Sequence, residues 1–285
     1  MSKRMGGEAL LPLQYFKLMR DRHIAAWVVC HARVREELAE ELSPDDFQRI
    51  RFVEETWLHT KIWQISQPFP YRVRDSVFSQ ILHLLTQRKA RLLVQQMIGE
   101  LGIQLVFQPS PIPPKAVSFM YDLDVPVVIG PMCGGLELPP AFQYMDSTFT
   151  HLSIWAGRIM SELLHKVIPG KVQAEALVVA NDLTAKALPR NCTGKRYEVI
   201  ESGVDLSLWQ PRSPIDPSSD RPVRFVFAGR FVDWKGVEFL IDAFAQAAPQ
   251  TNAVLELVGD GELRRVLEAQ VEQLGIKSQV IFMDG

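Results

Sequence analysis

Residues 223–236 read VRFVFAGRFVDWKG. The first six are mostly apolar, which is typical of a short buried strand. Gly229 follows this run, and Gly236 precedes the helical apolar pattern of residues 237–247. A buried strand that ends at a glycine and leads into a helix is the repeating unit of α/β folds with parallel sheets.

The same alternation fills most of the chain. Near-continuous apolar runs predict strands that are covered on both faces, as in parallel sheets. The expected strands are 24–30, 50–53, 105–107, 125–129, 176–180, 197–200, 223–228, 254–258 and 279–283. The expected helices are 9–20, 88–101, 237–247 and 262–274. We therefore predict an α/β protein with Rossmann-like units.

A proline-rich break divides this pattern. Residues 211–222 contain four prolines among serines and charged residues, so they form neither a helix nor a central strand. We predict an N-terminal Rossmann-like domain at 1–210, a linker at 211–222 and part of a second domain at 223–285.

Composition excludes several classes of function. The formal net charge is −2, which argues against a nucleic-acid partner. The three cysteines form no CxxC pair, and the scattered histidines show no metal-ligand spacing, so we expect neither disulfides nor a metal. No apolar signal or membrane-spanning window is present. We expect a cytoplasmic protein and leave contact with a membrane surface open.

The loop between the strand 223–228 and the helix 237–247 is the main candidate site. Arg230 can bind a diphosphate with its planar fork, and Lys235 adds a second positive charge. Gly229 allows a ligand to approach the backbone, and the first amides of the helix favour anions. The alternative is a solvated loop with two exposed cations.

Three segments in this order carry a family resemblance. Residues 201–211 (ESGVDLSLWQP), 227–236 (FAGRFVDWKG) and 255–263 (LELVGDGEL) resemble the "NGVD…F.P", "GR…KG" and "VGDGP" elements of glycosyltransferase family 4. One departure is Ser202, which stands where the family has an asparagine.

The resemblance implies a GT-B-like fold of two Rossmann-like domains. It also implies a retaining transferase for glycan biosynthesis that uses a UDP- or GDP-sugar donor, a glycan or lipid-linked acceptor and no other cofactor. Carried over, Gly229, Arg230 and Lys235 would bind the donor diphosphate, and Gly6 and Gly7 would match the family's N-terminal glycine loop.

A second glycine loop lies at residues 130–137 (GPMCGGLE), where many family members have a histidine. It resembles a subgroup with a "GP.GGGE" loop, so we assign no catalytic histidine and leave the catalytic residues unknown. Gly134 and Gly135 could admit a sugar against backbone amides, with Glu137 accepting hydroxyl hydrogen bonds. The alternative is a tight turn with a solvated carboxylate.

Three other features have two interpretations each. Trp57, His59 and Trp63 form either an aromatic acceptor surface or packing in the core or between domains. The basic cluster of residues 88–91 contacts anionic lipid or is a solvated helix face. The glycines of residues 259–261 suggest a dinucleotide-binding loop, but Arg264 replaces its third glycine.

The resemblance also implies that this is a fragment lacking both termini, with an incomplete second domain. A strand should precede Gly6, and the family's downstream glutamate pair, which holds the donor sugar and ribose, would lie beyond Gly285. The alternative function is a non-catalytic nucleotide-binding or scaffolding module. A downstream glutamate pair in the full reading frame would favour the enzyme.

We predict that residues 1–285, expressed alone, do not transfer sugar at a measurable rate. Without the glutamates the donor is poorly oriented, and orientation can account for several kcal/mol of a barrier. An assay of nucleotide release and sugar transfer, run beside a chain extended at both ends, measures this. Comparable turnover by the two chains would contradict the prediction.

Overall fold

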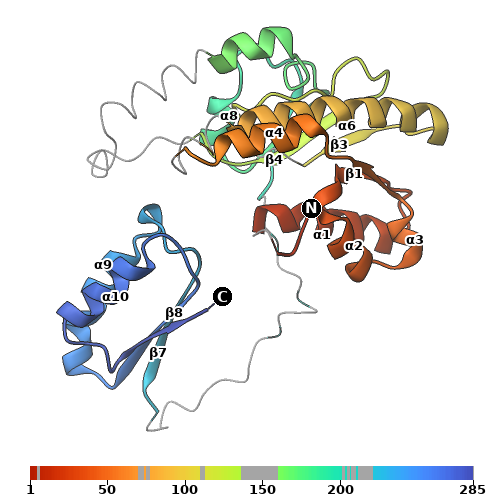
Figure 1. Ribbon diagram of the computed structural model, residues 1–285. Coiled ribbons are helices and arrows are strands. Elements are labelled where there is room, and N and C mark those ends of the chain that lie inside the picture. Colours follow the sequence, from red (N-terminus) through yellow and green to blue (C-terminus); the bar gives the residue numbers. More distant parts are fainter. Residues whose placement is uncertain are drawn as a thin grey trace. The chain divides into compact units, whose positions relative to one another are not determined.

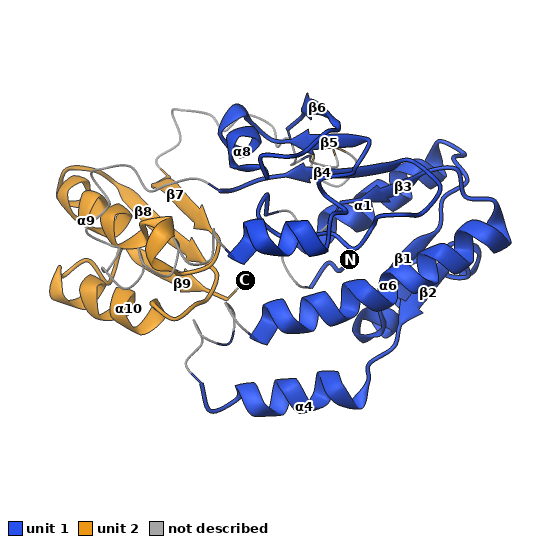
Figure 2. Cartoon of the chain, turned by 90° about the horizontal axis from the view of Figure 1, so that it is seen from above, with its two compact units in different colours: residues 1–205 blue, residues 206–285 orange. Residues whose placement is uncertain are grey.

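The computed structural model describes residues 1–4, 7–69, 74, 78–109, 113–135, 160–200, 203, 206, 210 and 221–284. The chain divides into two compact units, unit 1 at residues 1–205 and unit 2 at residues 206–285 (Figure 2). The predicted boundary at 210/211 stays a prediction, because residues 211–220 of the linker lie outside the described ranges.

Unit 1 begins with a helix and a small parallel sheet (Figure 1). Leu13 and Phe16 of the first helix pack with Leu38 and Ile50 in a buried cluster. The predicted strand at 24–30 is shorter in the structure. It starts at Val28, the first residue that pairs with the neighbouring strand, opposite Ile50. The elements are α1 (Gly7–Asp21), β1 (Val28–His31), η1 (Ala32–Val34), α2 (Arg35–Glu41), α3 (Pro44–Phe47) and β2 (Ile50–Val53).

The rest of unit 1 contains a four-stranded parallel sheet in the order β3-β4-β5-β6. Its buried core includes Met120, Ile129, Met132 and Leu177. The elements are α4 (Trp57–Ser66), α6 (Ser79–Leu101), β3 (Val106–Gln108), β4 (Val127–Met132), β5 (Ala176–Val179), α8 (Asp182–Ala187) and β6 (Lys195–Glu198). Within the described ranges no helix, including the long α6, is apolar enough over sufficient length to cross a membrane.

A buried polar network joins α6 to this sheet. The Gln87 side chain donates to Val117 O (3.0 Å) and accepts from the Gln108 amide (3.2 Å). Ser118 in turn donates to Gln108 Oε1 (2.6 Å). Buried amides are stable only when they are paired, so this network sets how α6 sits against β3 and the segment that follows it.

Unit 2 is a βαβαβ unit whose three parallel strands lie in the order β7-β8-β9. It comprises β7 (Val223–Ala228), η4 (Asp233–Lys235), α9 (Val237–Ala247), η5 (Ala248–Gln250), β8 (Ala253–Val258), α10 (Arg264–Gln273) and β9 (Val280–Met283). The α/β class with parallel sheets, predicted from the alternating pattern, is confirmed in both units.

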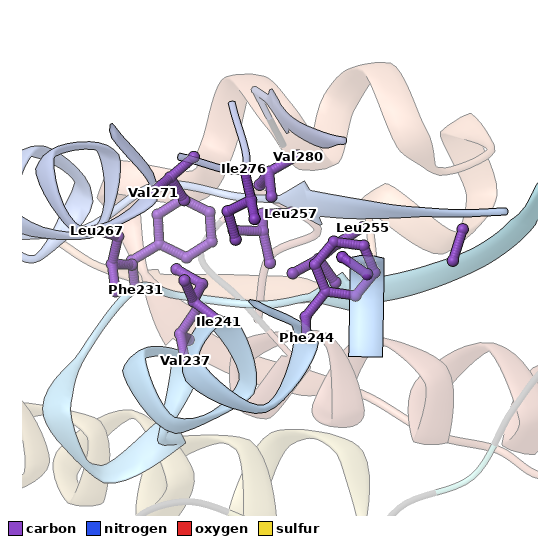
Figure 3. Close-up of a cluster of buried hydrophobic side chains, with 12 residues drawn as sticks. Phe231, Val237, Ile241, Phe244, Leu255, Leu257, Leu267, Val271, Ile276 and Val280 are labelled. Atoms are coloured by element: carbon purple, nitrogen blue, oxygen red, sulfur yellow. The ribbon is translucent and has the colours of Figure 1, made fainter. Parts of the chain in front are cut away.

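One hydrophobic core holds unit 2 together (Figure 3). Ile241 of α9, Leu267 of α10 and Leu255 and Leu257 of β8 are all fully buried in it. Leu255 and Leu257 are two positions apart in β8, so they point to the same face of the sheet, and they share one cluster with residues of both helices. α9 and α10 therefore cover the same face, as right-handed crossovers in one direction require.

The incomplete second domain that the resemblance implies would leave the helix 262–274 and the last strand without cover, and this expectation is partly wrong. α10 buries Leu267 and Val271 against the sheet, and Val280 of β9 is buried as well. Ile281 alternates to the other face and is exposed, as expected. On that face Arg224 of β7 forms an ion pair with the buried Glu256 of β8.

Two neighbouring residues of α10 test this packing. Leu267→Ala should destabilise unit 2 by about 2–5 kcal/mol, because it leaves a cavity in the core. Val266→Ala, at an exposed position, should change stability by no more than about 0.5 kcal/mol. Amide hydrogen exchange of β8 in the full chain measures both. Equal protection of β8 in the two variants would show that α10 does not stabilise the sheet.

Candidate functional site

The predicted phosphate-binding loop lies at the carboxyl end of β7. The Gly229 N–H donates to Val258 O at the end of β8 (3.0 Å), which extends the parallel pairing by one residue. The chain then runs through η4 to α9. Ligands of parallel α/β sheets bind at this edge, so the loop stands where a ligand site is expected.

Two glycines let a second loop pack directly on this one. A Cβ atom on Gly259 would lie 2.0 Å from Gly229 O, and one on Gly261 would lie 2.4 Å from Phe231 O. Backbone hydrogen bonds close the contact, from Phe231 N to Asp260 O (2.9 Å) and from Leu263 N to Phe231 O (3.2 Å). Side chains at these glycines would push the loops apart, so the loop geometry depends on both.

The loop presents two cations beside a helix N-terminus. Arg230 and Lys235 are exposed, whereas Phe231 between them is fully buried and anchors the loop. Among the described residues neither cation has an ion pair or a side-chain hydrogen bond. Gly236, in the left-handed conformation, ends η4 and begins α9 without a side-chain cap. The first amides of α9 therefore have no side-chain acceptor from this position, and such amides attract anions.

Arg264 has a structural role that the sequence did not suggest. Its guanidinium donates to Gly259 O (3.2 Å), to Asp284 (2.8 Å) and to Glu268 (3.0 Å). These bonds hold the start of α10, the glycine loop and the residue after β9 together. At the position of the third glycine of a dinucleotide-binding loop, this chain has Arg264, whose side chain connects three segments at the carboxyl end of the sheet.

The glycine loop of unit 1 follows β4. A Cβ on Gly135 would lie 2.4 Å from Ala187 Cβ and 2.9 Å from Pro114 Cγ. The Gly134 carbonyl accepts from the Thr184 hydroxyl (3.2 Å), so α8 and the segment around Pro114 fix this loop. Glu137 and Gly6 lie outside the described residues, and Gly7 is the first residue of α1. The roles assigned to these residues stay predictions.

A buried lysine that sequence reasoning missed lies behind this loop. Lys171 is fully buried, and its amine donates to Pro113 O (2.9 Å) and Pro114 O (3.0 Å). Burial lowers the pKa of the Lys171 amine to about 7. Because Pro114 also packs against Gly135, the hydrogen bonds of Lys171 help to hold the glycine loop in place. No sequence pattern around Lys171 distinguishes it from an exposed lysine, because its burial depends on tertiary contacts alone.

His59, Cys30 and Cys192 are buried or partly buried in packed surroundings. His59 caps α4 through Thr56 and is buried against Thr86 of α6. Burial raises the pKa of the Cys30 thiol to about 11, and that of Cys192 is raised for the same reason. No group of three possible metal ligands occurs in the part of the chain that the structure describes.

Comparisons with known proteins give a family match for the C-terminal part of the chain and a likeness in fold for the whole chain. Residues 213–285 match the family model "Glycosyl transferases group 1". An uncharacterised glycosyltransferase of Methanocaldococcus jannaschii is 38% identical over a 102-residue alignment that covers 33% of this chain and 26% of the relative. The chain thus spans about a quarter of this curated relative.

Two crystal structures of Anabaena HepE resemble the whole chain. The complex with UDP has a TM-score of 0.54 at 17% identity, and the complex with UDP-glucose has a TM-score of 0.52 at 18% identity. Each match covers 100% of this chain and 67% of HepE. At this identity the likeness concerns the fold, and it confirms the predicted GT-B-like class.

Lys171 makes a testable contribution to stability. Its amine loses its proton near pH 7 in the folded chain but near pH 10.4 in the unfolded chain, so unfolding takes up a proton between these values. The free energy of unfolding should therefore rise from about pH 7 to about pH 8.5, by up to about 1.4 kcal/mol per pH unit from this group.

Lys171→Met should lose this slope, whereas Lys166→Met, at an exposed position nearby, should keep it. Urea unfolding across the pH range, followed by circular dichroism, measures the difference. The same slope in Lys171→Met and the parent would contradict the assigned burial.

Proposed function

We propose that this chain, which belongs through residues 213–285 to the glycosyl transferases group 1 family, is part of a retaining hexosyltransferase. It takes a sugar from a nucleotide-sugar donor and transfers it to a hydroxyl group of an acceptor. The acceptor is a glycan or is linked to a lipid, and the protein acts in the cytoplasm or at a membrane surface. The observation that carries the proposal is the cationic loop at the carboxyl end of β7, which lies inside the family match.

The loop suits the diphosphate of a nucleotide-sugar. Arg230 can form two parallel charge-assisted hydrogen bonds to phosphate oxygens, and Lys235, the last residue of η4, adds a compact charge. The N-terminal amides of α9 complete a surface that favours negative charge.

The same groups assist the reaction. When the bond between the sugar and the diphosphate breaks, negative charge grows on the departing nucleoside diphosphate. Cations and amides that surround it stabilise that charge more than they stabilise the intact donor, and this lowers the barrier. The packing of Gly259 and Gly261 on the loop keeps its backbone in place before the donor arrives.

Unit 1 supplies the acceptor side in this proposal. Gly134 and Gly135 lie in a loop that α8, Pro114 and Lys171 hold, and Glu137 follows them in the sequence. The backbone amides and the carboxylate of this segment suit sugar hydroxyls. The role of Gly6 and Gly7 toward the donor phosphates stays a prediction.

The decisive test is nucleotide binding to the full chain. We expect isothermal titration calorimetry to detect binding of UDP or GDP. Arg230→Ala should reduce the affinity for whichever nucleotide the parent binds more tightly by about tenfold to a hundredfold. This corresponds to the loss of about 1.5–3 kcal/mol from a charge-assisted hydrogen bond.

Arg265→Ala is the matched control, because Arg265 is an exposed arginine on α10 outside the loop. It should leave the affinity unchanged. Equal affinities of the parent and Arg230→Ala, or no binding of either nucleotide by the parent, would refute the proposed donor site.

A further inference from the structure

The residues that follow the three strands of unit 2 form a row at the carboxyl end of the sheet. Figure 2 shows β7, β8 and β9 side by side. The Gly229 N–H donates to Val258 O (3.0 Å) and the Gly259 N–H donates to Met283 O (2.9 Å), so the parallel pairing continues past the strand ends. The row consists of Gly229, Gly259 and Asp284. Neighbouring strands are about 4.8 Å apart, so the two ends of the row are about 10 Å apart.

Arg264 holds the carboxylate of Asp284 on this row. Its guanidinium donates to Asp284 Oδ1 (2.8 Å) and to Gly259 O (3.2 Å), so the carboxylate lies beside the end of β8. A bond to Glu268 of α10 (3.0 Å) and the Phe282 ring below the guanidinium keep the arginine itself in place. The Asp284 side chain is still 92% exposed, so its oxygens have acceptor positions open to a ligand.

A nucleotide bound at the proposed donor site can extend along the row. Its diphosphate lies on the loop after β7, where Arg230 is exposed. In the described part of the sheet β7 has a neighbouring strand only on the side of β8, so the row leads from the loop toward β9. Gly259, in the middle, has no side chain to obstruct a ribose, and one strand spacing of about 4.8 Å is close to the width of a ribose ring. The base then reaches Asp284.

We propose that Asp284 selects guanine at the donor site, so that the donor is a GDP-sugar. This assignment rests on the proposed donor site and names its nucleotide. The Watson–Crick edge of guanine carries two neighbouring donors, the ring N1–H and the exocyclic amino group. A carboxylate accepts both with its two oxygens, in a planar pair of charge-assisted hydrogen bonds that gives strength and a fixed orientation.

Other groups of a nucleotide fit this carboxylate less well. Uracil has one N–H, which lies between two carbonyl oxygens that repel a carboxylate. Adenine and cytosine each present an amino group beside a ring nitrogen that is an acceptor. Each of these bases places an acceptor opposite a carboxylate oxygen, and such a contact works against binding. The ribose hydroxyls can also pair with a carboxylate, but the ribose is bonded to the diphosphate and lies closer to the loop than the base does.

Isothermal titration calorimetry of the full chain with GDP, inosine diphosphate and UDP tests the proposal. Inosine diphosphate keeps the ring N1–H of guanine and lacks its amino group, so it isolates one of the two bonds. The parent should bind GDP about tenfold or more tightly than either of the others, as the loss of one charge-assisted hydrogen bond implies. Asp284→Asn places an amide N–H₂ opposite the guanine donors. It should lower the affinity for GDP by about tenfold to a hundredfold and change that for UDP by less than about threefold.

Glu268→Gln is the matched control, because Glu268 is the other carboxylate that Arg264 contacts. The substitution weakens the hold on Arg264 in a similar way and leaves the Asp284 carboxylate intact. This variant should keep the preference for GDP over inosine diphosphate. Circular dichroism confirms that each variant folds.

Three results would overturn the selection of guanine. The first is equal binding of GDP and inosine diphosphate by the parent, or tighter binding of UDP. The second is an unchanged preference for GDP in Asp284→Asn. The third is an equal loss of affinity for all three nucleotides in Asp284→Asn, which would show that the carboxylate binds the ribose.

The donor site can survive each of these results, because weaker nucleotide binding by Arg230→Ala would still support it. No binding of any of the three nucleotides by the parent would refute the donor site, and the selection of guanine with it.

Discussion

The candidate donor site depends on the contact between two backbones at the edge of one sheet. Gly229 and Gly259 end neighbouring strands, and parallel pairing brings them so close that Gly259 has no room for a Cβ. Because that contact exists, the loop that carries Arg230 is fixed by backbone hydrogen bonds instead of by its exposed side chains. The two cations can therefore stay solvated and free of protein partners in the described part of the chain, while the loop that carries them stays ordered. A phosphate that replaces their water meets a backbone that has already lost its conformational freedom, so only the two side chains still have to be ordered.

Unit 1 adds buried polar side chains to the close glycine contacts that both units have. Gln87 and Gln108 join α6 to β3, and Lys171 holds the carbonyls of two consecutive prolines. Each of these groups would cost free energy if it were left unpaired in the interior. Their bonds therefore restrict the segment of residues 113–120, and through Pro114 they restrict the Gly134–Gly135 turn. A lysine whose pKa is about 7 makes the same two bonds as an ammonium or as a neutral amine, since either form has at least two N–H donors.

Much of the fold was predictable because the deciding signals are local. The run 223–228 is bounded by a glycine and followed by a helix with apolar residues at Val237, Ile241 and Phe244, and the structure has these elements at the predicted positions. The start of α6 was missed, since its first residues, 79–87, are uncharged and about half polar and follow a segment without helical periodicity. The position of the cationic loop followed from the strand end. The burial of Lys171 and the bonds of Arg264 did not, because they join residues far apart in sequence or depend on the return of β9 to the sheet edge.

The strand order of unit 2 has a consequence for how this unit acquires its structure. Each strand is added beside the one made before it, so Val223 pairs with Ala253, 30 positions later, and Leu255 pairs with Val280, 25 positions later. No strand of unit 2 is inserted between two strands that precede it in the sequence. The strand pairs of the unit are consequently closer in sequence than they would be around an inserted strand, and among parallel sheets a shorter separation favours faster folding. During synthesis, β7, α9 and β8 can form a first hydrophobic layer around Ile241 and Leu255 as soon as residue 258 has left the ribosome, with α10 and β9 joining it afterwards.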